Sequence, residues 1–268
     1  MKLSPVLFLA ASLGLLLMPT VRAADTEPGT LSAAQLASRL SEKEQSATSY
    51  VRLRMEMAGP KKSAIQVQIK SRAARGSAEV VYQILWPKER KGESVLLRRS
   101  GGQVTGTLFT PPDQTRTLGA AQLRDSLFGT DLSYEDVIEN FFAWEQQAIT
   151  GTETVDRVPC QILESKPGKG GPSVYGSVKS WIDAKRLVPL RVEKYSPAGK
   201  LVRRIETTRV MNDDEGKPVP SNLTVRGAGG DSTTELNGGK ISHHITFTDA
   251  DFTPEGIKQT VIPRGSAE

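Results

Sequence analysis

Two neighbouring stretches of the sequence alternate strictly between apolar and polar side chains. Apolar residues occupy every odd position of residues 51–57, and residues 65–69 repeat the pattern after a turn at Gly59–Lys62. A period of two places alternate side chains on opposite faces of a β-strand, so each stretch predicts a strand with one buried face. Together they predict an antiparallel hairpin. The residues expected on its buried face are Val51, Leu53, Met55, Met57, Ile65, Val67 and Ile69.

Strand-like segments continue along the chain on both sides of one interruption. Clusters of Gly, Pro and charged residues separate them, as is typical of turns. Strands in this arrangement, with no helices between them, predict an antiparallel sheet that curls into a barrel or a deep half-barrel. The segments are 78–86, 94–99 and 104–109 before the interruption, and 146–150, 160–165, 178–183, 189–196, 201–210, 222–226 and 241–248 after it.

The interruption, Leu118–Trp144, has the spacing of an amphipathic helix instead. Apolar residues recur there at i, i+3, i+4 and i+7, which places them on one helical face. Ser133 and Asp136 can satisfy the free amides of the first turn, so we expect the helix to begin at Ser133. The residues of its apolar face are Tyr134, Val137, Ile138 and Phe141.

We interpret this helix as a lid over the sheet that shifts when an apolar ligand takes its place. Gly129 and Thr130 offer a hinge, because glycine accepts backbone angles that other residues resist. The alternative is a permanent plug, since many amphipathic helices simply belong to a core. A shorter helix is predicted over residues 32–44, before the first strand.

The N-terminus predicts export from the cytoplasm. Lys2, an apolar run at Val6–Met18 and small residues at positions 21 and 23 are typical of a cleaved signal peptide, residues 1–23. The apolar run is shorter than the roughly 20 residues that a membrane-spanning helix needs. We therefore expect one soluble, non-membrane-spanning domain of residues 24–268. Its single cysteine, Cys160, is expected to be a buried small hydrophobe.

The charge of the exported protein argues weakly for anionic lipid surfaces. The chain has 35 basic and 30 acidic residues, and the predicted signal peptide removes Lys2 and Arg22, which leaves an excess of three positive charges. Such a mild excess in an exported protein argues against nucleic acid as a partner.

Histidines and acidic turns offer few sites for chemistry. His243 and His244 are adjacent in a predicted strand, so they point to opposite faces and cannot chelate one metal together. A Ser-His-Asp site that uses one of them stays open. The acidic turn at 213–215 lacks the alternating ligands of a calcium-binding loop, so we interpret it as a solvated turn.

Three carboxylates of the interruption, Asp131, Glu135 and Asp136, have two interpretations. They could form a pair of catalytic acids, but helix capping explains them more simply. We therefore predict no catalytic residues, no bound metal and no cofactor.

The most distinctive parts of the sequence are the block FGTDLSYEDV at Phe128–Val137 and the later run WIDAKRLVPLRVEKYSPAGKLVRRIE at Trp181–Glu206. From about Tyr50 to Pro263 the chain resembles the outer-membrane lipoprotein-sorting (LolA-like) proteins of Gram-negative bacteria. The resemblance implies a mainly β fold, an antiparallel half-open barrel whose mouth helices cover, and a periplasmic location.

The same resemblance implies a carrier that shields acyl chains of a lipid or lipoprotein in an apolar cavity during transfer toward the outer membrane. A membrane transporter or receptor would then be a partner. The seven apolar residues of the predicted hairpin would line the cavity. Two alternatives stay open: a regulatory protein of the same fold that senses lipid or lipoprotein, and an enzyme of lipid metabolism.

Overall fold

The computed structural model describes residues 31–45, 48–59, 62–74, 76–169, 171, 173–239, 241–243 and 245–263. The predicted signal peptide and His244 lie outside these residues. The first six strands are Ser49–Ala58 (β1), Ser63–Ala74 (β2), Ser77–Trp86 (β3), Ser94–Ser100 (β4), Gln103–Thr110 (β5) and Gln114–Leu118 (β6). The other seven are Gln146–Val155 (β7), Val158–Lys166 (β8), Ser177–Asp183 (β9), Val188–Tyr195 (β10), Leu201–Asn212 (β11), Pro218–Gly227 (β12) and Thr233–Gly238 (β13).

Helical structure is scarce in the same part of the chain. The one α-helix is Ala33–Gln45 (α1). The remaining helical pieces are 3₁₀ turns: Lys88–Arg90 (η1), Ala120–Arg124 (η2), Glu135–Val137 (η3), Phe141–Ala143 (η4), Asp249–Phe252 (η5) and Gly256–Lys258 (η6).

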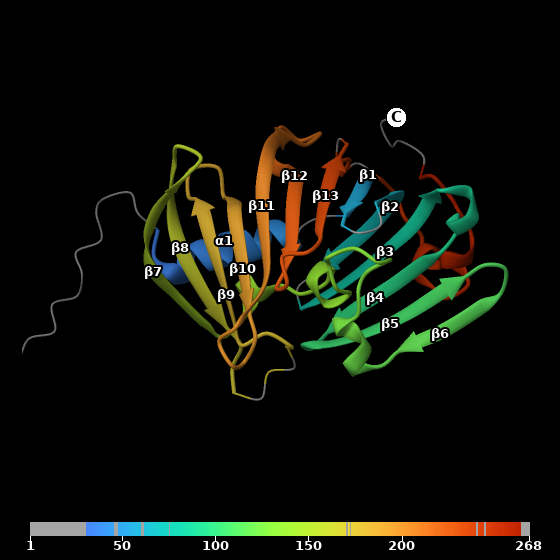
Figure 1. Cartoon of the computed structure of the whole chain (residues 1–268), viewed down its shortest axis with the longest axis horizontal. Helices are drawn as coiled ribbons and strands as arrows, with labels where there is room; N and C mark the ends of the chain where they lie inside the picture. The colour runs from blue at the N-terminus through green and yellow to red at the C-terminus, as the bar shows by residue number, and fades with distance from the viewer. Residues whose placement is uncertain are drawn as a thin grey trace, which may run out of the picture. The chain divides into compact units, whose positions relative to one another are not determined.

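All thirteen strands belong to one curved antiparallel sheet, which is open at both edges (Figure 1). Two meanders, β1 to β6 and β7 to β13, join where β1 pairs with β13. The edges of the sheet are β6 and β7. The predicted mainly β fold with an open antiparallel sheet is therefore confirmed.

The connection between β6 and β7, residues 119–145, joins the two opposite edges of the sheet. We call it the strap; it is the light-green segment in Figure 1. Thirteen strands leave twelve spacings of about 4.8 Å, so the sheet measures about 58 Å along its curve. One α-helix of the strap's 27 residues would reach only about 40 Å. A path that follows the curve would be longer than such a helix, and the strap itself contains only short 3₁₀ turns as helical structure.

The predicted α-helix from Ser133 was wrong, because the strap contains only 3₁₀ turns. The predicted cap does form: the Ser133 N–H donates to Asp136 Oδ2 at 2.7 Å, and η3 follows. That turn ends at Val137, and Asn140 starts the next one by accepting a hydrogen bond from the Ala143 N–H. Tertiary packing on two separate parts of the sheet overrides the helical spacing here.

Two further boundaries differ from the sequence analysis. The last strand is β13, whereas in the predicted segment 241–248 the described residues make only one isolated bridge, from Ser242 to Tyr50. Leu118, which was assigned to the helical stretch, ends strand β6. The predicted N-terminal helix is confirmed as α1, where Ser32 Oγ accepts a hydrogen bond from the Gln35 N–H.

Both faces of the β1–β5 half are covered. The inner face, defined as the one on which α1 and the strap pack, carries the two largest apolar clusters. On the outer face, Phe252 and Ile257 of the C-terminal segment 245–263 pack in a third cluster. Cys160 lies in a fourth cluster and is 2% exposed, which agrees with its interpretation as a buried apolar residue.

Candidate functional site

The seven apolar residues of the predicted hairpin lie on one face of β1 and β2. Val51 pairs with Ile69, Leu53 with Val67 and Met55 with Ile65, and paired residues of neighbouring strands share a face. Met55, Ile65 and Val67 are buried in the first apolar cluster. The partly buried residues Leu53, Met57 and Ile69 pack against that cluster.

The strap covers this apolar wall with side chains of its own. The turn η2 and the loop after it bury three leucines and a phenylalanine in the same cluster, and the two residues that flank η3 add an aromatic and a β-branched side chain. These six strap residues are Leu123, Leu127, Phe128, Leu132, Tyr134 and Ile138.

The four residues predicted for the lid face do not stay together. Tyr134 and Ile138 are buried in the first cluster, and Val137 packs against it. Phe141 belongs to the second cluster instead, where it stacks at 4.4 Å on Phe142 and packs with α1. The predicted single face is therefore wrong, because η3 and η4 serve two different parts of the sheet.

A cavity of about 410 Å³ remains between the inner face, the strap and the end of α1. Its volume lies within the range of about 300–1,000 Å³ that is usual for small-molecule sites. Its apolar lining consists of Val51, Ile69, Ala78, Val80 and Tyr82 from the sheet, and Val137 and Ile138 from the strap. Its charged lining includes Lys43, Glu44, Arg99 and Glu139. A lining that combines apolar and charged side chains suits an amphiphilic ligand.

A buried ion cluster fixes the strap above β10 and β11. The Lys194 ammonium lies 2.8 Å from Asp136 Oδ1, and the Arg203 guanidinium contacts Asp136 Oδ2. The Tyr175 hydroxyl donates to Asp136 Oδ1 at 2.7 Å. The Asp136 side chain is fully buried and that of Lys194 is 2% exposed. Such a pair is worth most as a position-fixing contact, since its desolvation offsets much of its attraction.

Sequence reasoning found Asp136 but missed its partners. Lys194 and Arg203 are paired across β10 and β11, so they share the inner face. The strand alternation could have revealed these partners. Val192 and Ile205 point inward, and Lys194 and Arg203 lie two residues away from them on the same strands, so they share that face. Asp136 is thus both the predicted cap and a partner for two buried cations.

Two more carboxylates hold the strap at other points. Asp131 accepts hydrogen bonds from the hydroxyls of Thr234 and Ser232, and so ties the strap to β13. Glu135 Oε1 accepts hydrogen bonds from the Val174 N–H and from Ser173 Oγ, each at 2.9 Å. The three carboxylates that could have been catalytic therefore serve as anchors.

Burial dominates the electrostatics around these anchors. It raises the pKa of the Glu135 carboxyl and raises that of the Tyr175 hydroxyl to about 12. It lowers the pKa of the Lys194 ammonium, and the nearby carboxylates of Glu139 and Glu135 oppose that shift. Burial thus disfavours the charged forms of the Glu135 carboxyl and the Lys194 ammonium.

No helix among the described residues is long and apolar enough to cross a membrane.

A family model described as that of an uncharacterized protein matches residues 76–259. No curated protein matches the sequence.

Three solved structures have a similar fold. A DUF1329 family protein from Desulfovibrio piger is 20% identical, with a TM-score of 0.77 over 84% of this chain and 97% of its own. A domain described as outer membrane lipoprotein-sorting, from Vibrio parahaemolyticus, is 17% identical, with a TM-score of 0.76 over 85% and 98% of the two chains. A LolA superfamily protein from Nitrosomonas europaea is 18% identical, with a TM-score of 0.68 over 84% and 99%. The predicted LolA-like fold is therefore confirmed.

Proposed function

This chain belongs to the family of uncharacterized proteins whose model matches residues 76–259, and on that premise we propose that it is a carrier. It shields the acyl chains of a lipid or lipoprotein in the periplasm and delivers them toward the outer membrane. A relative in fold is described as lipoprotein-sorting, which supports this class of cargo. The carrier releases its cargo to a membrane transporter or receptor.

The observation that carries the proposal is the cavity of about 410 Å³ between the apolar wall and the strap. The wall residues Val51 and Ile69 line it directly, and the β1 and β2 residues beyond them continue the wall beneath the strap. An acyl chain that enters this space extends by replacing strap side chains on the wall.

The free energies of two states, one with the strap on the wall and one with cargo on the wall, are nearly equal in this proposal. Burial of apolar surface contributes roughly 25 cal/mol per Å², whether the surface belongs to leucines of the strap or to an acyl chain. A small difference in contact area therefore decides which of them occupies the wall.

The anchors define which part of the strap moves. Asp131 and Asp136 hold the strap from residue 131 onward, and the Arg90 guanidinium holds it at the Phe128 carbonyl. The movable part in this proposal is therefore residues 119–127, in place of the predicted lid residues after Ser133. Phe128 has φ +54°, an unfavourable angle for a residue with a side chain, and Gly129 has φ +89°. This pair takes the place of the predicted hinge at Gly129 and Thr130.

Mass spectrometry of an organic extract of the purified protein tests the carrier function. We expect acyl lipid to co-purify at a defined ratio, and a fluorescent acyl probe to displace it. An extract without lipid, together with no binding of the probe, would contradict the proposal.

A disulfide across the hinge tests the movement. Ser126 and Ser133 form an antiparallel bridge pair, so their Cα atoms lie about 4.5–5.5 Å apart, which a disulfide can span. With Cys160→Ser as background, the double change Ser126→Cys and Ser133→Cys should block probe exchange when oxidised and restore it when reduced. The single variant Ser133→Cys controls for the lost cap. Unchanged exchange in the oxidised protein would show that the strap is a permanent plug.

Periplasmic export is the remaining part of the proposal. We expect N-terminal sequencing of the periplasmic fraction to find Ala24 as the first residue. Met1 at the N-terminus, or recovery from the cytoplasm alone, would contradict export.

A further inference from the structure

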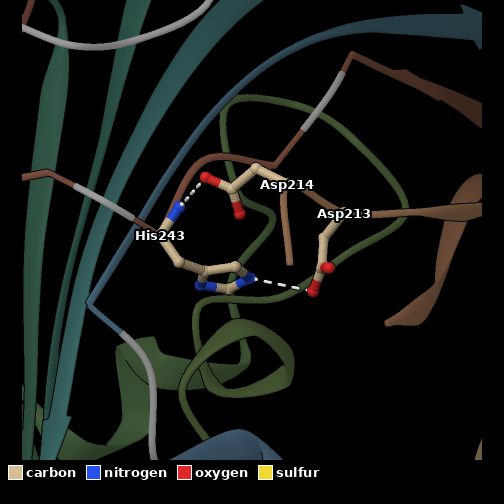
Figure 2. Close-up of side chains that lie close together, drawn as sticks. All are labelled: Asp213, Asp214 and His243. Carbon is tan, nitrogen blue, oxygen red and sulfur yellow. Dashed lines mark hydrogen bonds and ion pairs between the residues drawn. The ribbon is translucent and has the colours of Figure 1, made fainter. Parts of the chain in front are cut away.

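Three side chains of types that can bind a metal ion meet at the end of β11 (Figure 2). Asp213 and Asp214 follow that strand directly, and His243 comes from the segment after β13. His243 Nε2 lies 3.1 Å from Asp213 Oδ2, and the His243 N–H donates to Asp214 Oδ2 at 2.7 Å.

The interpretation of this acidic turn as solvated was wrong for Asp213. Its side chain is 2% exposed, and its Oδ1 accepts hydrogen bonds from the N–H groups of Glu215 and Lys217. Those bonds fold the turn back on the carboxylate and leave Oδ2 directed at His243. The histidine is remote in sequence, so spacing alone did not reveal it.

The separations fit a single cation. One ligand atom from each of the three residues can be chosen so that all lie within 4.8 Å of one another. Ligand atoms about 2.0–2.2 Å from a tetrahedral zinc ion lie roughly 3.3–3.6 Å apart. The distance of 3.1 Å between His243 Nε2 and Asp213 Oδ2 is close to that spacing. The third ligand atom lies within 4.8 Å of the other two, so binding requires it to move closer by at most roughly 1.4 Å.

The surroundings leave room for water ligands. Asp213 and His243 both line a second cavity, of about 830 Å³, at the rim of the sheet. Lys43 lines it too, and its charge weakens cation binding, but its Nζ donates to the carbonyl groups of Leu187 and Pro218. The Lys217 ammonium pairs with Glu215 at 2.6 Å.

We propose that Asp213, Asp214 and His243 bind one divalent transition-metal ion, with zinc preferred over calcium. The imidazole nitrogen favours zinc, copper or nickel, whereas calcium takes six to eight oxygen ligands. Water from the cavity completes the coordination. This site lies in the second cavity, which shares Lys43 and Ser49 with the cavity under the strap, but it does not depend on the carrier function.

Calorimetric titration of the metal-stripped, untagged protein with Zn²⁺ tests the site, with Cys160→Ser as background so that no thiol competes. We expect one ion per chain and a tenfold or larger loss of affinity in His243→Gln. The matched control His244→Gln should stay within about twofold of the parent protein, because His244 is not one of the three proposed ligands. Substitution by Co²⁺ should give visible absorption bands that His243→Gln changes.

Asp214→Asn gives a second measurement in case His243→Gln does not keep its native circular dichroism. It should also lower zinc affinity at least tenfold. No zinc binding by the parent protein, calcium binding as tight as zinc binding, or unchanged zinc affinity in a folded variant of either ligand would overturn the proposal.

Discussion

Asp136 neutralises one buried cation and one mostly buried cation, since the side chain of Lys194 is 2% exposed and that of Arg203 is 13% exposed. Its carboxylate contacts both Lys194 and Arg203 and is itself fully buried. Asp136→Asn keeps the size of the side chain but removes the carboxylate that contacts both cations. Breaking a buried pair from one side costs about 3–5 kcal/mol, so we expect a loss of that order in the free energy of unfolding, measured in urea.

An exposed ion pair gives the control for that experiment. Arg54 and Glu56 lie 2.6 Å apart with side chains 45% and 46% exposed. Glu56→Gln should change the free energy of unfolding by less than about 1 kcal/mol, because water screens the pair. Equal effects of the two variants would mean that Asp136 does not carry the buried network.

Glu135 should make stability depend on pH in a direction opposite to that of a typical paired carboxylate. Burial raises the pKa of its carboxyl above the ordinary value of 4.5; hydrogen bonds from Val174 and Ser173 oppose the shift, and the Glu139 carboxylate adds to it. The charged form is thus disfavoured in the folded protein. The cost is fully present above the folded pKa and disappears as the pH falls through it toward 4.5.

Glu135→Gln removes this cost and keeps the Oε1 acceptor. The variant should be more stable than the parent protein near neutral pH, and the difference should shrink as the pH falls toward 4.5. Urea unfolding at a series of pH values measures both proteins. A difference that does not change with pH would exclude titration of Glu135 as its cause.

At the scale of elements, the sequence predicts the strands better than the strap. Residues 51–57 and 65–69 alternate because one face of each strand packs on a core and the other meets water or the C-terminal segment, so local pattern and final structure agree. The helical spacing around Tyr134 and Phe141 does not correspond to a helix in the structure, because the two residues pack in different clusters. Contacts that are remote in sequence decide the conformation of the strap.

Strand β3 offers a way to fill the cavity without a buried charge. Ala78 lies on the inner face and lines the cavity. Ala78→Phe should occupy part of the 410 Å³ and lower acyl-probe affinity at least tenfold, while circular dichroism stays native. Ala74→Phe, at an exposed position on the neighbouring β2, is the matched control and should bind the probe normally. Equal binding by both variants would place the ligand elsewhere.

For the whole molecule, the strand order explains why the strap exists. Both meanders could be foreseen from turns and alternation, but their union through β1 and β13 could not, because pairing between chain segments this remote has no local signal. That union sends β6 and β7 to opposite edges and forces the strap across the inner face. The cluster of Asp213, Asp214 and His243 lies beside the same union, since Ser242 bridges to Tyr50 of β1.

The C-terminal segment is the counterpart of the strap on the outer face, and its removal from the core should be costly. Phe252 is fully buried against Val81, Leu96 and Phe109, and the Arg72 guanidinium lies 4.4 Å from its ring. Phe252→Ala should lower the free energy of unfolding by about 3–5 kcal/mol, because it leaves a cavity between segment and sheet.

The control lies in the same segment, where Ile262 is 51% exposed. Ile262→Ala should change the free energy of unfolding by no more than about 0.5 kcal/mol. If Phe252 holds the segment down, its loss also uncovers an apolar patch on the sheet, so light scattering should detect association of Phe252→Ala but not of Ile262→Ala. A Phe252→Ala protein that stays monomeric and as stable as the control would show that the outer face does not depend on this segment.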